Sequence, residues 1–292
     1  MKITLKDVPA LVAIDQTKDW KPFTDMLFGL QDADPGYMLL NRASIPYDQK
    51  LRYVLAWCTF YNPGLAAKAS DYQGKKFYEY LRTIYPTAKR ATERRHFRGQ
   101  AGLKALASWE AAYPRPEDMV LACFGPTYMD VRKNMKPMYL LGDYFYWKLA
   151  DIQDTVFGHY VDFTGAEQYM PQLPKQGAAI IADMQYDGLL GVDGLLAKQE
   201  LVEVMEVVTG HASRLKHPFQ DRALALQEAE TVCCVFKQHI YGNYRYGFRS
   251  AKAYKRLTSM RAETTTANKL LEGLYAGGIW DEPKLQKVAE SL

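Results

Sequence analysis

The sequence has no long apolar run. None of its apolar stretches approaches the ~20 residues that a membrane-spanning helix needs. The first twenty residues carry three aspartates and lack the apolar core of a secretory signal. The four cysteines also lack the spacing of metal ligands. We therefore expect a cytoplasmic protein with reduced, mostly buried thiols at Cys58, Cys123, Cys233 and Cys234.

Several common catalytic signatures are also missing. Gly74-Lys75 has neither the upstream glycine nor the following Ser/Thr of a phosphate-binding loop. No G-x-S-x-G elbow, Cys/His zinc pattern or dinucleotide fingerprint occurs. The missing phosphate-binding loop argues against a chain that is itself a nucleotide-dependent kinase.

Strand-like alternation is scarce, and its clearest case is brief, at residues 158–163. Apolar residues instead recur at three- and four-residue steps, with Pro and Gly between the segments. We predict an all-α fold and a single domain over residues 1–292, either undivided or in two helical lobes. Helices are expected near residues 19–30, 47–61, 66–69, 76–84, 103–113, 143–157, 178–184, 197–208, 221–239, 250–257 and 264–275, and one more is expected to follow the loop at residues 114–118.

Acidic residues are absent from residues 231–262, which carry seven Lys/Arg. Residues 89–104 add six Lys/Arg and one acid. These two segments carry a net charge of +12, so the rest of the chain, whose total is +4, carries −8. Concentrated positive charge on an otherwise acidic protein is typical of a partner for a polyanion.

The central segment, residues 137–163, organises the chain. A corner at Gly142 leads into an amphipathic helix that Gly158 is expected to end. Asp162 follows, and Thr164 with Glu167 matches a T-x-x-E capping box. We expect a second helix to begin directly after Asp162 and to keep its carboxylate ionised. The simpler interpretation is that Asp162 only caps that helix.

Three stretches together resemble a known family: ERRHFRG (93–99), GDYFYWKLADIQDTVFGHYVDF (142–163) and EAETVCCVFKQHIYGNYRYG (228–247). They are similar to the bacteriophage amino acid:DNA transferases, also called α-glutamyl/putrescinyl-thymine pyrophosphorylases. They also resemble the helical domain of 5-hydroxymethyluracil DNA kinases. The resemblance covers most of the chain and implies action on phage DNA in the host cytoplasm.

A more distant resemblance is to the helix-hairpin-helix DNA glycosylases, because Asp162 follows Gly142 by twenty positions. In that superfamily the corner grips the DNA backbone and the aspartate is the catalytic carboxylate. The corner here lacks the second glycine of that family. Asp143 or Tyr144 replaces its lysine, which argues against base excision through a Schiff base.

Two segments are candidates for DNA contact. Arg94, Arg95, His96 and Arg98 could be a solvated basic helix end, but the resemblance favours phosphate binding. Residues 237–256 alternate cations with aromatic rings, as proteins that hold unpaired bases do, although an aromatic turn between helices is the simpler alternative. The candidates there are Lys237, His239, Tyr241, Tyr244 and Arg249, and Glu230 on the preceding segment fits a helix-surface acid equally well.

Lys148 and Asp151 lie three residues apart on the central helix. A surface ion pair and a pocket-facing pair explain this spacing equally well. The candidate catalytic residues are therefore Asp162, Asp151, Lys148 and His96, with Asp162 as the leading carboxylate.

The resemblance implies that an amine displaces pyrophosphate from 5-(pyrophosphooxymethyl)uracil in duplex DNA, with the base flipped out. Such a site needs cations for the leaving group, a carboxylate for the amine and rings for the base. The sequence demands no cofactor and is compatible with Mg²⁺ on the pyrophosphate. A DNA glycosylase and a non-catalytic DNA-binding subunit remain alternatives, and the amine is not indicated.

Overall fold

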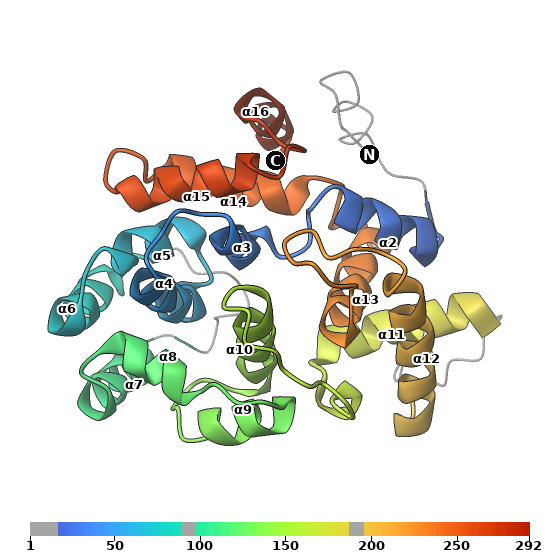
Figure 1. The fold of residues 1–292 in the computed structure, drawn as a ribbon, viewed down its shortest axis with the longest axis horizontal. Helices are drawn as coiled ribbons and strands as arrows, with labels where there is room; N and C mark the ends of the chain where they lie inside the picture. The colour runs from blue at the N-terminus through green and yellow to red at the C-terminus, as the bar shows by residue number, and fades with distance from the viewer. Residues whose placement is uncertain (1–16, 89–96, 98, 187–195) are drawn as a thin grey trace. The chain divides into compact units, whose positions relative to one another are not determined.

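The computed structural model describes residues 17–88, 97, 99–186 and 196–292 (Figure 1). Within these ranges the chain forms helices and no β-strand, so the all-α prediction is confirmed. Each described helix is too short or too polar to cross a membrane. Cys58, Cys123 and Cys233 are buried and Cys234 is half-buried, as expected.

The chain divides into two compact units. The first unit comprises Met1–Pro35, Asp162–Ala251 and Gly277–Leu292, and the second comprises Gly36–Val161 and Lys252–Ala276. The first unit contains α2 (Trp20–Gly29), η3 (Glu167–Tyr169), α11 (Gln172–Tyr186), α12 (Lys198–Ala212), α13 (Leu226–Ile240) and α16 (Glu282–Glu290). The second contains η1 (Leu39–Asn41), α4 (Tyr47–Phe60), α5 (Pro63–Ser70), α6 (Gly74–Ile84), α7 (Gly99–Ala112), α8 (Pro116–Ala122), α9 (Tyr128–Met135), α10 (Asp143–Thr155) and α15 (Thr265–Tyr275). Two of the four boundaries fall within helices, α3 (Pro35–Met38) and α14 (Phe248–Thr258). The single domain therefore stays a prediction.

Helix α13 forms the centre of the first unit and packs against α11, α12 and α2. Gly177 on α11 permits close packing, since a Cβ atom there would lie 1.9 Å from the Cys233 carbonyl oxygen. Phe23 on α2 contacts the rings of Phe236 and His239, with ring centroids 5.2 and 5.0 Å apart. An aromatic core with one glycine contact thus holds α13 in place.

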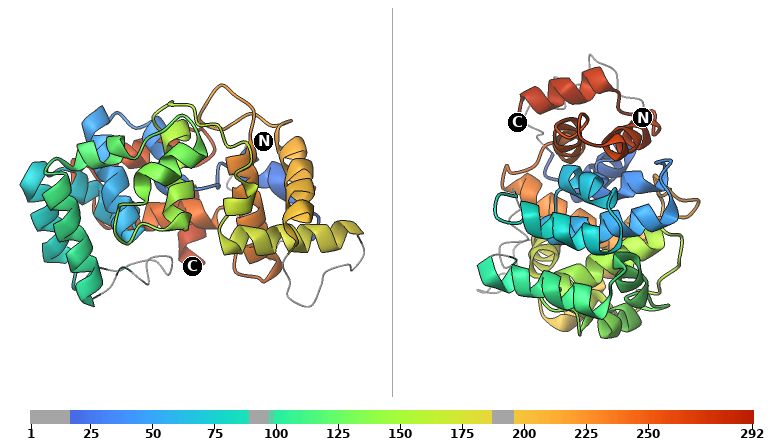
Figure 2. Two further views of the ribbon diagram at one scale, coloured as in Figure 1. Left: turned by 90° about the horizontal axis from the view of Figure 1, so that it is seen from below. Right: turned by 90° about the vertical axis from the view of Figure 1, so that its left-hand side faces the viewer.

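Helix α4 forms the centre of the second unit, and every residue from Leu51 to Phe60 is buried. Arg52 makes a buried ion pair with Glu117 of α8. Gly64 lets α5 approach α14, because a Cβ atom there would lie 2.3 Å from the Arg256 carbonyl oxygen. At the edge of this unit, α6 and α7 lie side by side, as Figure 2 shows.

Several expected boundaries need correction. No α-helix begins directly after Asp162: a turn and η3 follow, and α11 begins at Gln172. The N-cap of η3 is Ala166 and makes no side-chain hydrogen bond, so the T-x-x-E capping box does not form. Helix α13 begins at Leu226 and not at residue 221. The helix expected near residues 66–69 begins earlier, at Pro63, because the Asn62 side chain caps α5.

Two helices, α9 and α16, were not expected from the sequence. Thr127 caps α9, and its hydroxyl accepts a hydrogen bond from the Asp130 N–H group at 3.1 Å. Asp281 caps α16 in the same way, with the Lys284 N–H group at 2.9 Å. Both helices are short, so their apolar period is weak, but both have a Thr or Asp N-cap that marks a helix start.

We predict that Gly177→Ala lowers the free energy of unfolding by about 1–3 kcal/mol, because the new methyl group overlaps the α13 backbone. Urea denaturation followed by circular dichroism measures this change.

Gly210→Ala on α12 is the matched control. Nothing lies within 4 Å of a Cβ atom at that position. Alanine there is expected to raise stability by about 0.5–1 kcal/mol through its helix propensity. Equal stability of the two variants would contradict the close packing of α11 on α13.

Candidate active site

Helix α10 carries a buried ion pair. Lys148 Nζ lies 4.0 Å from Asp151 Oδ2, and the two side chains are 5% and 3% exposed. The Tyr37 hydroxyl donates a hydrogen bond to the same Asp151 oxygen. This burial excludes a surface ion pair, and a pocket-facing role for the two side chains stays a prediction. No sequence pattern marks Tyr37, which reaches α10 from a position 114 residues away.

Burying two opposite charges contributes little to stability, because each loses several kcal/mol of hydration on leaving water. A hydrophobic pair of similar size would pack α10 at least as well. Buried ionisable groups that hold each other in place are typical of functional sites. Lys148, Asp151 and Tyr37 are therefore our candidate catalytic cluster in the second unit.

Gly142 forms the expected corner before α10. It is the N-cap residue, with φ −104° and ψ −171°, and makes no side-chain capping bond. Its carbonyl oxygen accepts hydrogen bonds from the N–H groups of Phe145 and Tyr146 at 2.8 and 3.1 Å. Gly158 follows α10 with φ +68°, as expected of a glycine that ends a helix. The glycosylase-like hairpin itself stays a prediction.

Asp162 lies in a turn rather than at a helix start. One of its carboxylate oxygens accepts hydrogen bonds from the Thr164 hydroxyl and N–H groups at 2.6 and 2.8 Å. These two bonds lower the pKa of Asp162, so it is ionised at neutral pH. The expected charge state is therefore found, but the cause is Thr164 and not a helix dipole. The side chain is half-buried.

The first unit has its own buried carboxylate, Asp32. It accepts hydrogen bonds from the Tyr244 hydroxyl at 2.6 Å and from the Ser250 N–H group at 2.7 Å. Burial raises the pKa of Asp32, and the bonds from Ser250 and Tyr244 oppose that shift. Ser250 lies in the first turn of α14, where N–H groups have no partner within the helix. Asp32 accepts the hydrogen bond of one such group from a distant part of the sequence.

Asp34 lies two residues further on, with a left-handed φ of 38°. Its carboxylate lies 3.2 Å from Arg249 Nη2 and accepts a hydrogen bond from the Thr231 hydroxyl at 3.0 Å. Thr231 also contacts a carboxylate oxygen of Glu230, 3.3 Å away. Glu230 is 1% exposed, so the helix-surface alternative is wrong. Arg249, expected at DNA, is ion-paired with Asp34.

The other DNA-binding candidates of the first unit have different environments. Tyr244 and His239 are 2% and 8% exposed and belong to the aromatic core, so neither presents a ring for stacking. His239 Nε2 lies 2.9 Å from the Thr17 carbonyl oxygen. In contrast, Tyr241 is 64% exposed. Lys237 Nζ lies 5.9 Å from the centre of the Tyr241 ring and donates a hydrogen bond to Gln176.

Four candidates, Arg94, Arg95, His96 and Arg98, lie outside the described residues. Phe97 between them is described. It is buried and its ring centroid lies 5.5 Å from that of Trp109. Among the described parts of the chain, no group of three or more His, Cys, Asp or Glu side chains could hold a metal ion.

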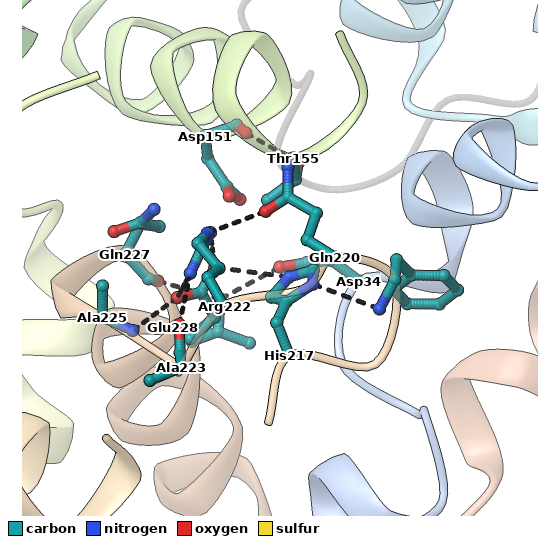
Figure 3. A network of polar contacts seen from close by, with 12 residues as sticks. Asp34, Asp151, Thr155, His217, Gln220, Arg222, Ala223, Ala225, Gln227 and Glu228 are labelled. Carbon is teal, nitrogen blue, oxygen red and sulfur yellow. Dashed lines mark hydrogen bonds and ion pairs between the residues drawn. The ribbon is translucent and has the colours of Figure 1, made fainter. Parts of the chain in front are cut away.

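A network of ion pairs and hydrogen bonds around Glu228 in the first unit was not expected from the sequence (Figure 3). Arg222 binds Glu228 through two parallel contacts of 3.0 and 2.8 Å. His217 Nε2 lies 3.5 Å from Glu228, and His217 Nδ1 accepts a hydrogen bond from the Phe219 N–H group. The Glu228 carboxylate also accepts a bond from the Ala225 N–H group at 2.7 Å, which caps α13. The network fixes residues 215–225 and explains why α13 begins late.

We predict that Glu228→Gln lowers the free energy of unfolding by about 3–5 kcal/mol, since it removes the charge that Arg222 and His217 face inside the protein. Urea denaturation at pH 7 gives the difference from the wild type.

Glu200→Gln on α12 is its matched control. Glu200 occupies the same third position of its helix and accepts a bond from the Ala197 N–H group at 2.7 Å, but it is exposed. Its replacement is expected to cost less than about 1 kcal/mol. Similar losses in both variants would mean that Glu228 acts only as a helix cap.

The chain matches known proteins over most of its length. A family model described as amino acid:DNA transferase matches residues 15–245. A glycinyltransferase of Pseudomonas phage PaMx11 is 31% identical over 242 residues, which are 75% of this chain and 82% of that protein. A putrescinyltransferase of Delftia phage PhiW-14 is 28% identical over 233 residues, 78% of this chain and 74% of that relative.

The residues matched by the family model include the buried pair of the second unit and the buried acids of the first unit that are described above. It contains α10 with Lys148 and Asp151, and it contains Asp34, Glu230 and Glu228. It ends at residue 245, before α14, α15 and α16. The chain belongs to the amino acid:DNA transferase family.

Proposed function

We propose that the protein is a DNA hypermodification transferase that joins an amine to the 5-methylene carbon of 5-(pyrophosphooxymethyl)uracil in DNA. A carbon–nitrogen bond forms and the carbon–oxygen bond to pyrophosphate breaks. Pyrophosphate leaves with the electron pair, and the amine loses a proton. Our choice of catalytic residues rests on one observation, the buried Lys148–Asp151 pair on α10, which lies inside the family match.

Asp151 is the carboxylate that orients the amine and takes its proton, and Lys148 faces the charge that develops on the leaving pyrophosphate. Tyr37 holds the Asp151 carboxylate in one orientation through its hydroxyl group. Asp162 is the second candidate. The Thr164 side chain and N–H group already donate two hydrogen bonds to one Asp162 oxygen, and these bonds lower the pKa of Asp162 and so its strength as a base. The structure therefore moves our first choice from Asp162 to Asp151.

Cations on the surface hold the DNA backbone. Lys252 and Lys255 on α14 are exposed, as is Arg245 just before it. Tyr241, with Lys237 beside its ring, is the candidate for stacking on a base. The basic segment with Arg94, Arg95 and Arg98 is proposed to bind phosphate on the strength of its sequence alone.

One experiment tests the reaction and its alternatives together. The protein is incubated with DNA that contains 5-(pyrophosphooxymethyl)uracil and a panel of amines, including glycine and putrescine because relatives are named for them. Mass spectrometry of the digested DNA is expected to show an amine adduct and released pyrophosphate. A released base would indicate a glycosylase, and unchanged DNA a binding subunit, and either result would overturn the proposal.

We predict that Asp151→Asn lowers amine transfer by about 10²–10⁴-fold, as expected for the loss of a general base. DNA affinity, measured by fluorescence anisotropy, is expected to stay near the wild-type value. Because the asparagine leaves Lys148 buried without its counter-charge, circular dichroism must first show that the variant folds.

Two further variants distinguish Asp151 from Asp162 as the catalytic carboxylate. Tyr37→Phe keeps Asp151 and its charge but removes one hydrogen bond, so it should fold and lose about tenfold in rate, near the ~1.4 kcal/mol of one such bond. Asp162→Asn should retain transfer within about tenfold. Normal turnover in Tyr37→Phe, together with inactive Asp162→Asn, would transfer the catalytic role to Asp162.

We also predict that Lys252→Glu with Lys255→Glu weakens binding to any DNA sequence and reduces the salt dependence of binding by about two counterions. Lys287→Glu on α16, an exposed lysine outside both basic segments, is the control and should change neither quantity. Unchanged affinity at low salt in the double variant would show that α14 does not contact DNA.

A further inference from the structure

The second unit presents an aromatic surface just beyond the end of α10. It consists of four side chains in mutual contact, Tyr47, Phe124, Phe157 and His159, and of Tyr160, which follows His159 in the sequence; we call these five the aromatic patch. Tyr160 is 72% exposed and Tyr47 is 44% exposed. Soluble proteins rarely leave several large rings in water at one place unless the surface binds something. Neither the buried cluster on α10 nor the basic residues of α14 include this surface.

The rings of the patch support one another. The Tyr47 and Phe157 centroids lie 5.2 Å apart with the rings inclined at 68°. Phe124 contacts both Phe157 and His159, with centroids 5.4 and 5.6 Å apart. The Tyr47 hydroxyl lies 3.4 Å from His159 Nε2. Edge-to-face contacts of this kind favour one arrangement of the rings.

The backbone beneath the rings is held by one buried side chain, Gln153. Its amide group exchanges two hydrogen bonds with Gly125, at 2.9 and 2.8 Å, and donates a third to the His159 carbonyl oxygen at 3.3 Å. The His159 N–H group also bonds to the Gln153 carbonyl oxygen at 3.1 Å. The patch is thus built before any ligand arrives, and binding costs little conformational entropy.

The chemistry of the exposed rings fits a nucleobase. Tyr47, His159 and Tyr160 combine a flat apolar face with a polar edge, which matches a base with its ring nitrogens and carbonyl groups. Lys50 follows Tyr47 by three residues on α4, so the two residues lie on one side of the helix, where Lys50 is half-buried. The segment 156–161 contains no acidic residue, but the exposed Asp48 lies beside Tyr47, so ring stacking and not positive charge must supply the affinity of this surface.

We propose that the aromatic patch stacks on an unpaired base that neighbours the base being modified. This proposal rests on the proposed function, in which the substrate polymer is DNA. The two bases are distinct, because Lys148 and Asp151 are almost completely buried while the patch is exposed. Stacking of a neighbour would compensate for the base contacts that are lost when the reacting nucleotide leaves the helix.

Binding alone tests this subsite, without any transfer chemistry. The probes are a fluorescein-labelled single-stranded oligonucleotide of unmodified bases and the same strand fully paired, measured by fluorescence anisotropy over a range of salt concentrations. Tyr160→Ala and His159→Ala are each expected to weaken single-strand binding by about tenfold, or about 1.4 kcal/mol, with smaller losses on the paired strand. The salt dependence should stay unchanged, since stacking releases no counterions.

Tyr160→Phe keeps the ring and is expected to bind as the wild type does. Tyr139→Ala removes a tyrosine that is 49% exposed elsewhere in the second unit and should have no effect. Wild-type affinity of both alanine variants would overturn the proposal, and so would a loss that Tyr160→Phe shares. Concentration-dependent self-association that Tyr160→Ala abolishes, with DNA affinity intact, would assign the patch to a protein contact instead.

The outcome is separable from that of the proposed function. If the protein transfers no amine but the alanine variants still lose single-strand affinity, the subsite stands and the reaction is wrong. If transfer occurs and these variants bind normally, the reaction stands and the subsite is wrong.

Discussion

Buried carboxylates constrain both units, because each one needs hydrogen-bond donors or cations, and most of these come from a distant part of the sequence. Asp32 is satisfied by the start of α14, more than 200 residues away, and Asp151 by Tyr37. Glu117 pairs with Arg52, and Glu228 with Arg222. A buried carboxylate without donors would cost several kcal/mol, so these side chains cannot be satisfied until the distant elements have packed. The helices therefore depend on polar contacts for their positions as well as on apolar packing.

These groups differ in what they offer to chemistry. Arg222 binds both carboxylate oxygens of Glu228, and Arg52 makes a buried ion pair with Glu117. We therefore assign both glutamates to holding the fold together. Asp151 has a phenol and an ammonium group as neighbours. Neither neighbour forms the two-pronged contact that arginine makes, so a substrate amine can compete for the carboxylate. This difference is the physical basis of our proposal that the reaction takes place at α10.

The charge of the surface that we propose to bind DNA also depends on the fold. The segment 231–262 has no acidic residue, yet the loop after α2 brings Asp34 against Arg249 and Asp32 against the start of α14. Arg249 therefore stabilises the first unit, and the cations left at the surface are fewer than the sequence count suggests. Lys252 and Lys255, on the exposed side of the same helix, carry the electrostatic part of DNA binding in our proposal.

The sequence by itself determined the helical class, most helix positions and the family. These depend on local periods and on short stretches such as residues 142–163, which need no knowledge of distant contacts. It also placed Gly158 at a helix end, because a positive φ is a local property of glycine.

Only the tertiary structure decided which polar residues are available for chemistry. Asp162 and Asp151 look alike in sequence, but one lies in a turn held by Thr164 and the other is buried against Tyr37. Tyr244 and Tyr241 are three residues apart, yet one is in the core and the other in solvent. Burial and hydrogen bonding arise from residues far apart along the chain, and no local pattern records which partners will meet.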